Sequence, residues 1–126
     1  MKINDPNVLA EVEAACAAYE AALVGNNVAT LRRLFWEDPR TIRYGIGENL
    51  HGSDEIAAFR AARSPLGLAR QLERTVITTF GDDFATASTL FRRDGVPGKI
   101  GRQMQSWVRL PEGWRIVAAH VSLIDA

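Results

Sequence analysis

The chain has 126 residues, of which 47% are hydrophobic and 24% are charged, and its 15 basic and 15 acidic side chains cancel. This length and composition predict one globular domain over residues 1–126, with a core that needs no metal or disulfide to support it. The balanced charge argues against nucleic acid and acidic membrane surfaces as partners.

Cysteine usage and hydropathy indicate the compartment. Cys16 is the single cysteine, so no intrachain disulfide can form, and a reducing compartment fits best. No stretch approaches the ~20 apolar residues that span a membrane, and the N-terminal segment MKINDPNVLA lacks the apolar run of a signal peptide. We therefore expect a cytoplasmic protein.

The first predicted element is a helix between Asn4 and Gly25. Asp5 as N-cap, Pro6 in the first turn and a glycine after the last turn are the usual helix boundaries. The spacing of three and four places Tyr19 on the buried face of this helix. The apolar residues that share this spacing are Leu9, Val12, Cys16, Tyr19 and Leu23.

Two further helices are predicted before the chain changes its pattern. The second is short, begins at Asn27 and buries Leu31, Leu34 and Phe35. The third begins at the run Ser53-Asp54-Glu55, with the serine as cap and two acids that suit a helix N-terminus. It should end before Pro65, because the residue preceding a proline disfavours helical geometry.

Between the second and third helices, the segment TIRYGIGENLHG (residues 41–52) predicts a short strand followed by a glycine-containing turn. Strand alternation directs Arg43 to the face opposite Ile42 and Tyr44. That face is either solvent or a pocket that requires a permanent positive charge.

From residue 69 onward the pattern has a period of two. We predict four long strands at 69–80, 84–93, 101–110 and 113–123, joined by turns at GDD, DGVPGK and PEG. Helices followed by a long antiparallel meander define an α+β fold, in which the helices cover one face of a curved sheet.

Strand alternation suggests which polar residues line a pocket. In the last strand, His120 and Ser122 share a mostly apolar face with Trp114, Ile116 and Ala118, which suggests a pocket wall. The alternative is a core histidine with satisfied hydrogen bonds and a hydroxyl at the end of a strand. In the preceding strand, one face carries Arg102 and Met104 and the other Gln103 and Gln105, and alternation alone does not choose between them.

Other charged residues are first assigned to structure. Arg60 and Arg63 occupy the last turn of the third helix, where cations complement the helix dipole. Arg70 and Arg74 fit a solvated strand face, and Glu20, like Glu11 and Glu13, fits the wet side of the first helix.

Motifs for cofactors are missing from the sequence. Two histidines and one cysteine in separate elements argue against a zinc site, and the signatures of dinucleotide, nucleotide and serine-hydrolase sites do not occur. We expect no metal and no cofactor, and Cys16 on its apolar stripe should be unreactive.

Three segments carry a family resemblance that extends from about Val8 to Leu123. They are LFWEDPRTIRYGIGENLHG, FRAARSPLGLARQLERTVITTFGDDFATA and GRQMQSWVRLPEGWRIVAAHVSL. They resemble the AtzH-like family, also represented by HpxZ, of the SnoaL-like superfamily, whose fold is the cone of nuclear transport factor 2. The resemblance implies a strongly curved antiparallel sheet wrapped by three helices around a cavity, and a homodimer. We expect the dimer to pack through the outer face of the sheet, because Val117, Val121 and Leu123 would otherwise expose an apolar patch.

The same resemblance implies an activity. Family members occur beside amidase-signature hydrolases in bacterial catabolism of nitrogen-rich compounds. The AtzH-like branch is proposed to convert 1,3-dicarboxyurea to allophanate as a deamidase-type enzyme. Its essential pair is a tyrosine of the first helix and the arginine of the TxRxG strand, which match Tyr19 and Arg43.

Two hypotheses follow. In the first, the protein is a small hydrolase: Arg43 clamps a substrate carboxylate through two hydrogen bonds, and Tyr19, whose pKa is lowered by that charge, transfers a proton. In the second, it is a non-catalytic subunit that holds a small anion or associates with a neighbouring amidase. The residues predicted to bind the substrate are Tyr44, Arg70, Arg102, Gln105, His120 and Ser122.

Overall fold

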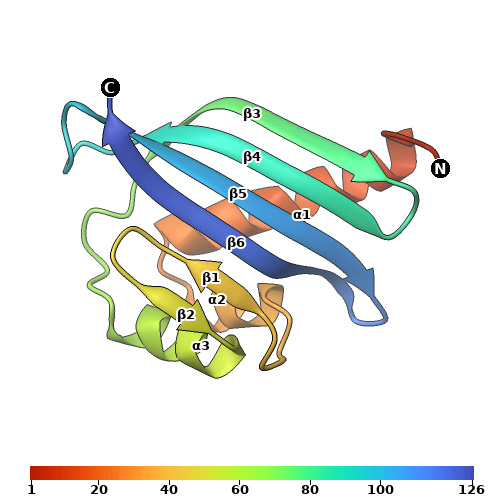
Figure 1. Ribbon diagram of the computed structural model, residues 1–126, viewed down its shortest axis with the longest axis horizontal. Coiled ribbons are helices and arrows are strands. Elements are labelled where there is room, and N and C mark those ends of the chain that lie inside the picture. The colour runs from red at the N-terminus through yellow and green to blue at the C-terminus, as the bar shows by residue number, and fades with distance from the viewer.

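A curved six-stranded sheet forms one layer of the computed structural model, which describes residues 1–126 (Figure 1). Side by side, the strands are β2 (Asn49–His51), β1 (Ile42–Tyr44), β6 (Gly113–Asp125), β5 (Lys99–Leu110), β4 (Phe84–Arg92) and β3 (Gln71–Phe80). All neighbouring pairs are antiparallel except β1 and β6, which run parallel. The four predicted long strands are confirmed, whereas β2 was not predicted as a separate strand.

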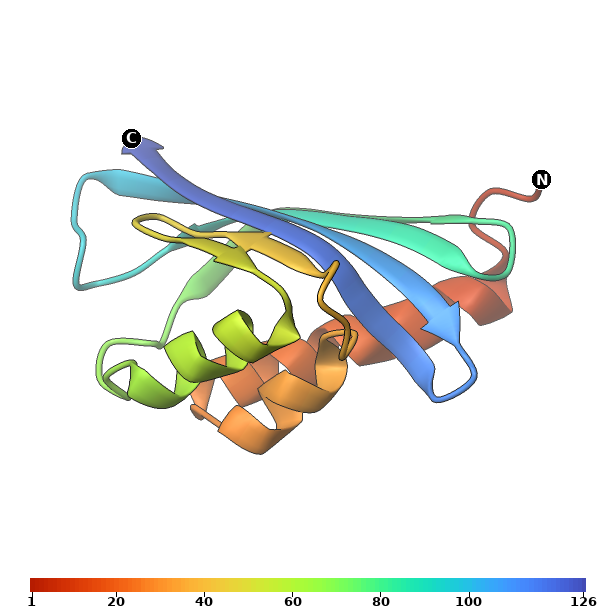
Figure 2. The same cartoon turned by 60° about the horizontal axis from the view of Figure 1, so that its bottom comes forward.

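Three helices lie together on one face of this sheet (Figure 2), as the sequence predicts. They are α1 (Pro6–Val24), α2 (Val28–Leu34) and α3 (Ser53–Ala62). The Asp5 carboxylate caps α1 by accepting hydrogen bonds from two backbone N–H groups, and the side-chain oxygen of Asn27 caps α2 by accepting one from the backbone N–H of Thr30. The predicted cap of α3 is wrong, because Gly52 takes that position with φ 92° and Ser53 is already helical. No helix is both long and apolar enough to cross a membrane.

The core fills the space between the helices and the sheet. Fully buried apolar side chains from both layers meet there, and each contributes about 1.5–3 kcal/mol of folding free energy through its burial. They include Val12, Leu31, Phe35, Phe91, Trp107 and Ile116. Gly101 lies opposite Phe91 on the neighbouring strand, and a Cβ at this glycine would collide with the phenyl ring. The glycine therefore leaves room for the Phe91 ring, over which two arginines lie.

A bulge in β6 decides which side chains face the helices. Trp107 pairs with Ile116, whereas Ser106 pairs with Ala118, so Val117 has no partner in β5. An extra residue in one strand reverses the alternation beyond it. The face that carries Ile116 before the bulge therefore continues as Ala119 and Val121, which are buried, and not as His120 and Ser122.

Candidate anion-binding site

Tyr19 lies near the end of α1 with its ring in the core. Its residue is 3% exposed, and the ring packs edge-on against Phe35 with 6.3 Å between centroids. Its hydroxyl accepts a hydrogen bond of 2.9 Å from Nη2 of Arg60 on α3, whose residue is 1% exposed. The predicted orientation of Tyr19 is confirmed, and a buried arginine accompanies it.

Arg43 projects from β1 toward the same side of the sheet. It pairs in register with the inward Ala119, whereas Tyr44 pairs with His120, so the predicted opposition of the two neighbours is confirmed. The guanidinium donates from Nη1 to Glu48 at 2.8 Å and lies 5.4 Å from the centre of the Phe59 ring. A Cβ at Gly45 would collide with this ion pair, so the glycine allows the turn to close over it.

Arg70 precedes β3 and ties that strand to α1. Its Nε and Nη2 donate to the two carboxylate oxygens of Glu20 at 2.8 and 2.7 Å, and Nη2 also donates to Gln103 at 3.0 Å. The guanidinium stacks 4.6 Å from the centre of the Phe91 ring. The interpretation of Arg70 and Glu20 as solvated surface residues is therefore wrong, because the two form a partly buried bidentate ion pair.

Two more arginines complete the cluster. Arg63, just after α3, lies over Phe59 at 5.9 Å, and Arg93, just after β4, lies over Phe91 at 5.3 Å. Each phenyl ring is thus shared by two guanidinium groups. Arg60, Arg63 and Arg93 form no ion pair with a carboxylate, and buried nitrogens of all three lack a hydrogen-bond partner.

The charges of this cluster shift the pKa values of its members. Burial alone would raise the pKa of Tyr19, but Arg60, Arg43 and Arg70 outweigh it, and the pKa falls below its usual value. Burial and the neighbouring Arg60 lower the pKa of Arg43. Burial, Arg60 and Arg43 lower the pKa of Arg63 to about 10. The arginines therefore stabilise the phenolate of Tyr19 relative to that of a free tyrosine.

A cavity of about 40 Å³ adjoins the ring of Tyr19 between α1 and the sheet. Glu20, Gln103 and Gln105 supply polar groups to its wall. Since one water needs about 10–15 Å³, this cavity has room for about three waters. The prediction that Arg43 lines the same cavity as Tyr19 is wrong, because no arginine contributes to its wall. Gln105 is held in place by a hydrogen bond of 3.0 Å that it accepts from the Trp107 indole.

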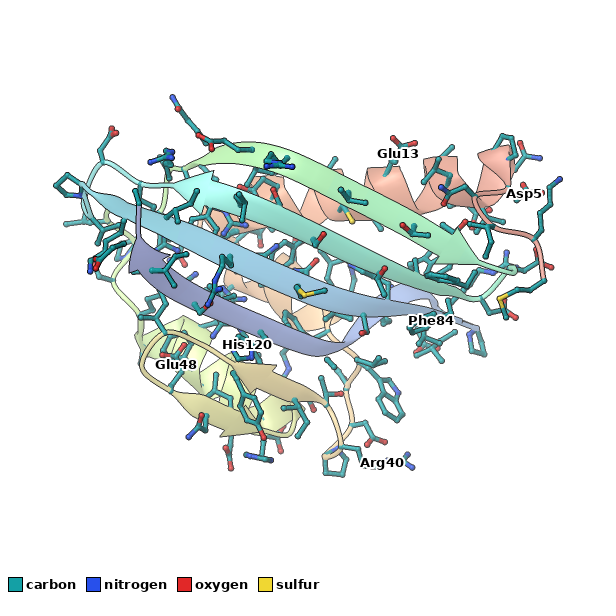
Figure 3. The ribbon with its side chains drawn as sticks, turned by 45° about the horizontal axis from the view of Figure 1, so that its top comes forward. Asp5, Glu13, Arg40, Glu48, Phe84 and His120 are labelled. Carbon is teal, nitrogen blue, oxygen red and sulfur yellow. The ribbon has the colours of Figure 1, made fainter.

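The structure divides the residues predicted to bind the substrate into two groups. Arg70 and Gln105 lie on the helix side of the sheet with Tyr19 and Arg43. The other four lie on the outer face, which Figure 3 views with His120 on β6, and they are Tyr44, Arg102, His120 and Ser122. The prediction that His120 and Ser122 form the wall of the Tyr19 cavity is wrong, because the Val117 bulge turns them outward.

Sequence reasoning missed Arg60, whose side chain contacts Tyr19 directly. The residue was assigned to the helix dipole because it lies in the last turn of α3. A signal was present, since Arg60 follows the buried Ile56 and Ala57 by four and three residues and so shares their helical face.

Comparisons with known proteins agree with this geometry. The AtzH-like family matches residues 1–126. A protein of unknown function from Pectobacterium atrosepticum is 62% identical, with a TM-score of 0.95 over 98% of this chain and 95% of that one. A cystatin-like fold protein from Burkholderia xenovorans is 52% identical, with a TM-score of 0.96 over 100% and 98%.

More distant structures show the fold alone. A nuclear transport factor 2-like superfamily protein from Salmonella enterica is 23% identical, with a TM-score of 0.73 over 92% of this chain and 90% of that one. No match was found among curated proteins. From the family match and the two similar structures, we conclude that the chain belongs to the AtzH-like family and has the α+β fold of nuclear transport factor 2-like proteins.

Proposed function

We propose that the protein is a small amidohydrolase-type enzyme that acts on a carboxylated urea or a related amide, such as 1,3-dicarboxyurea. The observation that carries the proposal is the buried Tyr19 hydroxyl, which accepts a hydrogen bond from Arg60. It lies inside a cluster of arginines that outnumber the carboxylates beside them and keep buried N–H groups without partners. The resemblance that assigns Tyr19 and Arg43 as an essential pair supports it.

The charge balance of the cluster favours an anionic ligand. Five arginines gather around Tyr19, and only Glu20 and Glu48 neutralise any of them. A buried donor without a partner costs about 1–3 kcal/mol, and more when it is charged. A ligand carboxylate would accept from these N–H groups and remove that penalty, and a guanidinium is suited to bind it bidentately.

The atoms of the reaction define what the site must do. Conversion of 1,3-dicarboxyurea to allophanate exchanges one N-carboxylate for hydrogen. As a hydrolysis, water adds to that carboxyl carbon, the carbon–nitrogen bond breaks, and bicarbonate and allophanate leave. The urea nitrogen gains one proton, and water loses one. Tyr19 can move this proton, because its phenolate accepts it from water and its phenol returns it to the nitrogen.

Arg43 would hold and orient the acid group. Its Nε is buried and free of partners, and the Glu48 carboxylate engages only Nη1. A guanidinium retains its proton at neutral pH, so it neutralises the carboxylate throughout the reaction. Cys16 is not a competing nucleophile, since burial raises the pKa of its thiol to about 12.

The second candidate function is a non-catalytic anion-binding subunit, alone or beside an amidase. One feature favours it: among the side chains that line the cavity beside Tyr19, only Tyr19 itself has a pKa that is shifted toward neutral pH.

We further propose a homodimer that forms through the outer face of the sheet, where Met104 and Val76 are 60% and 57% exposed.

Turnover by highly purified protein separates the two functions. Fresh 1,3-dicarboxyurea would be incubated with wild-type protein, Tyr19→Phe, Arg43→Lys and the control Arg33→Lys, and allophanate would be measured by mass spectrometry. Arg33 is exposed on α2 and forms no ion pair. Catalysis predicts turnover in the wild type and the control alone. Binding without turnover supports the subunit, and unchanged turnover in both site variants refutes the proposed site.

A further inference from the structure

Arg63 and Arg93 are partly buried, have no acid beside them and, unlike Arg60, have no hydrogen-bond partner on a neighbouring side chain. The exposed Arg92, beside Arg93 in sequence, does have a carboxylate partner and donates to Glu73 at 2.9 Å. Arg63 and Arg93 form no ion pair, although both are partly buried. Nε and Nη2 of Arg63 and Nε of Arg93 are buried without any hydrogen-bond partner. Folding alone gives no reason to keep two such groups unpaired.

The two guanidinium groups are held next to the proposed site. Arg63 shares the Phe59 ring with Arg43, and Arg93 shares the Phe91 ring with Arg70. The rings fix both cations by cation–π contact, at separations of 5.3 and 5.9 Å. The charge of Arg93 also contributes to lowering the pKa of Arg63. The two guanidinium groups are therefore close enough to interact electrostatically.

Their place in the fold suits an entrance. Arg63 begins the connection from α3 to β3, and Arg93 begins the connection from β4 to β5. Figures 1 and 2 show both connections at the end of the molecule where the β1–β2 turn also lies. That turn carries Glu48, the partner of Arg43. A ligand held by Arg43 would therefore extend toward Arg63 and Arg93.

We propose that Arg63 and Arg93 form a second anion subsite, which binds the outer carboxylate of a dicarboxylate whose inner carboxylate is bound by Arg43. The proposal rests on the proposed function for the location of the inner carboxylate. Three of the five arginines, Arg60, Arg63 and Arg93, have no carboxylate partner within the protein. The cluster therefore carries enough positive charge to neutralise both carboxylates of such a ligand. The subsite makes the protein select dianions over monoanions.

Glutarate and butyrate are stable probes for this subsite. Glutarate separates its carboxylates by three atoms, as 1,3-dicarboxyurea does, and butyrate is the same chain with one carboxylate removed. Their dissociation constants would be measured by titration calorimetry with wild-type protein, Arg63→Gln, Arg93→Gln and Arg43→Gln. Arg92→Gln is the matched control, since it removes the same charge one residue away from Arg93 at an exposed position.

We expect wild-type protein and Arg92→Gln to bind glutarate at least about tenfold more tightly than butyrate. Arg63→Gln and Arg93→Gln should each weaken glutarate about tenfold, the effect of losing one charge-assisted hydrogen bond, and leave butyrate within about twofold. Arg43→Gln should weaken both probes. Equal loss of both probes in Arg63→Gln and Arg93→Gln, or no loss, overturns the subsite.

This outcome is distinguishable from failure of the proposed function. Neither probe is a substrate, so binding is read without turnover. If 1,3-dicarboxyurea is not converted but glutarate selectivity depends on Arg63 and Arg93, the subsite stands and the enzymatic proposal falls. Thermal unfolding of each variant verifies that a loss of binding does not come from a loss of folded protein.

Discussion

The guanidinium of Arg60 donates a hydrogen bond of 2.9 Å to the Tyr19 hydroxyl, and both residues are almost completely buried. An arginine keeps its proton, so the tyrosine is the member of the pair that titrates. Burial favours the neutral phenol, whereas a cation that donates to the oxygen favours the phenolate. Arg60 is also 5.8 Å from the Phe35 ring, which limits its movement away from Tyr19.

The first prediction concerns this pair. Arg60→Gln should raise the pKa of Tyr19, because the largest stabilisation of its phenolate is removed while burial remains. The chain has two tyrosines, so in a Tyr44→Phe background the ultraviolet absorbance of tyrosinate reports Tyr19 alone. Groups facing Tyr19 that remain charged are Arg43, Arg63, Arg70, Arg93 and Glu20.

The activity profile should follow the titration. If Tyr19 accepts the proton from water, the rate rises with pH through its pKa, and in Arg60→Gln this rise moves to higher pH. Arg60→Lys should move it less, since the charge is kept. If Tyr19 titrates at the same pH in Arg60→Gln as in the wild type, Arg60 does not lower the pKa of Tyr19.

The second prediction separates folding from chemistry at Tyr19 and Arg43. Tyr19→Phe removes one hydroxyl, so we expect a folded protein whose turnover falls about 10²–10⁴-fold, the usual contribution of a general acid or base. Arg43→Lys keeps the charge but loses the planar fork, and it should lose most of the activity through a higher KM. Steady-state kinetics on 1,3-dicarboxyurea, with circular dichroism as the folding control, test both. Wild-type kinetics in both variants would show that this pair is not the site.

Local pattern was enough for much of the fold. Helix boundaries at Asp5, Asn27 and Gly25 follow from short-range capping chemistry, and period-two alternation gave the four long strands. The orientation of His120 was not predictable, because the bulge at Val117 arises from a register shift between β5 and β6 and leaves no mark in the sequence.

The candidate site was predictable in part. Alternation within β1 placed Arg43 opposite Tyr44, and helical spacing placed Tyr19 inward, so these two orientations required no tertiary knowledge. The ion pair of Arg70 with Glu20 joins residues 50 positions apart, and no local pattern could identify it. The gathering of arginines from α3, β1 and two connections is likewise a property of the tertiary structure.

The third prediction is that binding groups of the site reduce stability. Arg63→Met removes a partly buried cation that has no acid partner and keeps the apolar stem over Phe59. Since unpaired charges in such positions destabilise the native state, the variant should be more stable by about 1 kcal/mol. Urea unfolding at neutral pH measures this, with Arg92→Met as the control that breaks an existing ion pair. A clear loss of stability in Arg63→Met would mean that Arg63 supports the fold.

The last prediction concerns assembly. The dimer was expected to form through Val117, Val121 and Leu123, but Val121 is 5% exposed and belongs to the core of one chain, so it cannot supply this contact. On the outer face, register pairing instead aligns one row across five strands, consisting of Val76, Ser88, Met104, His120 and Tyr44.

Met104 is at the middle of that row and 60% exposed, so in a dimer packed through this face it would be buried. Met104→Glu places two like charges together in an apolar contact and should convert the dimer to a monomer. Light scattering should give twice the chain mass of 13.9 kDa for wild-type protein and one chain mass for the variant. Glu13→Gln, an exposed change on α1, is the control that should leave the mass unchanged. A wild-type monomer at micromolar concentration, or a variant that remains dimeric, would rule out this face as the interface.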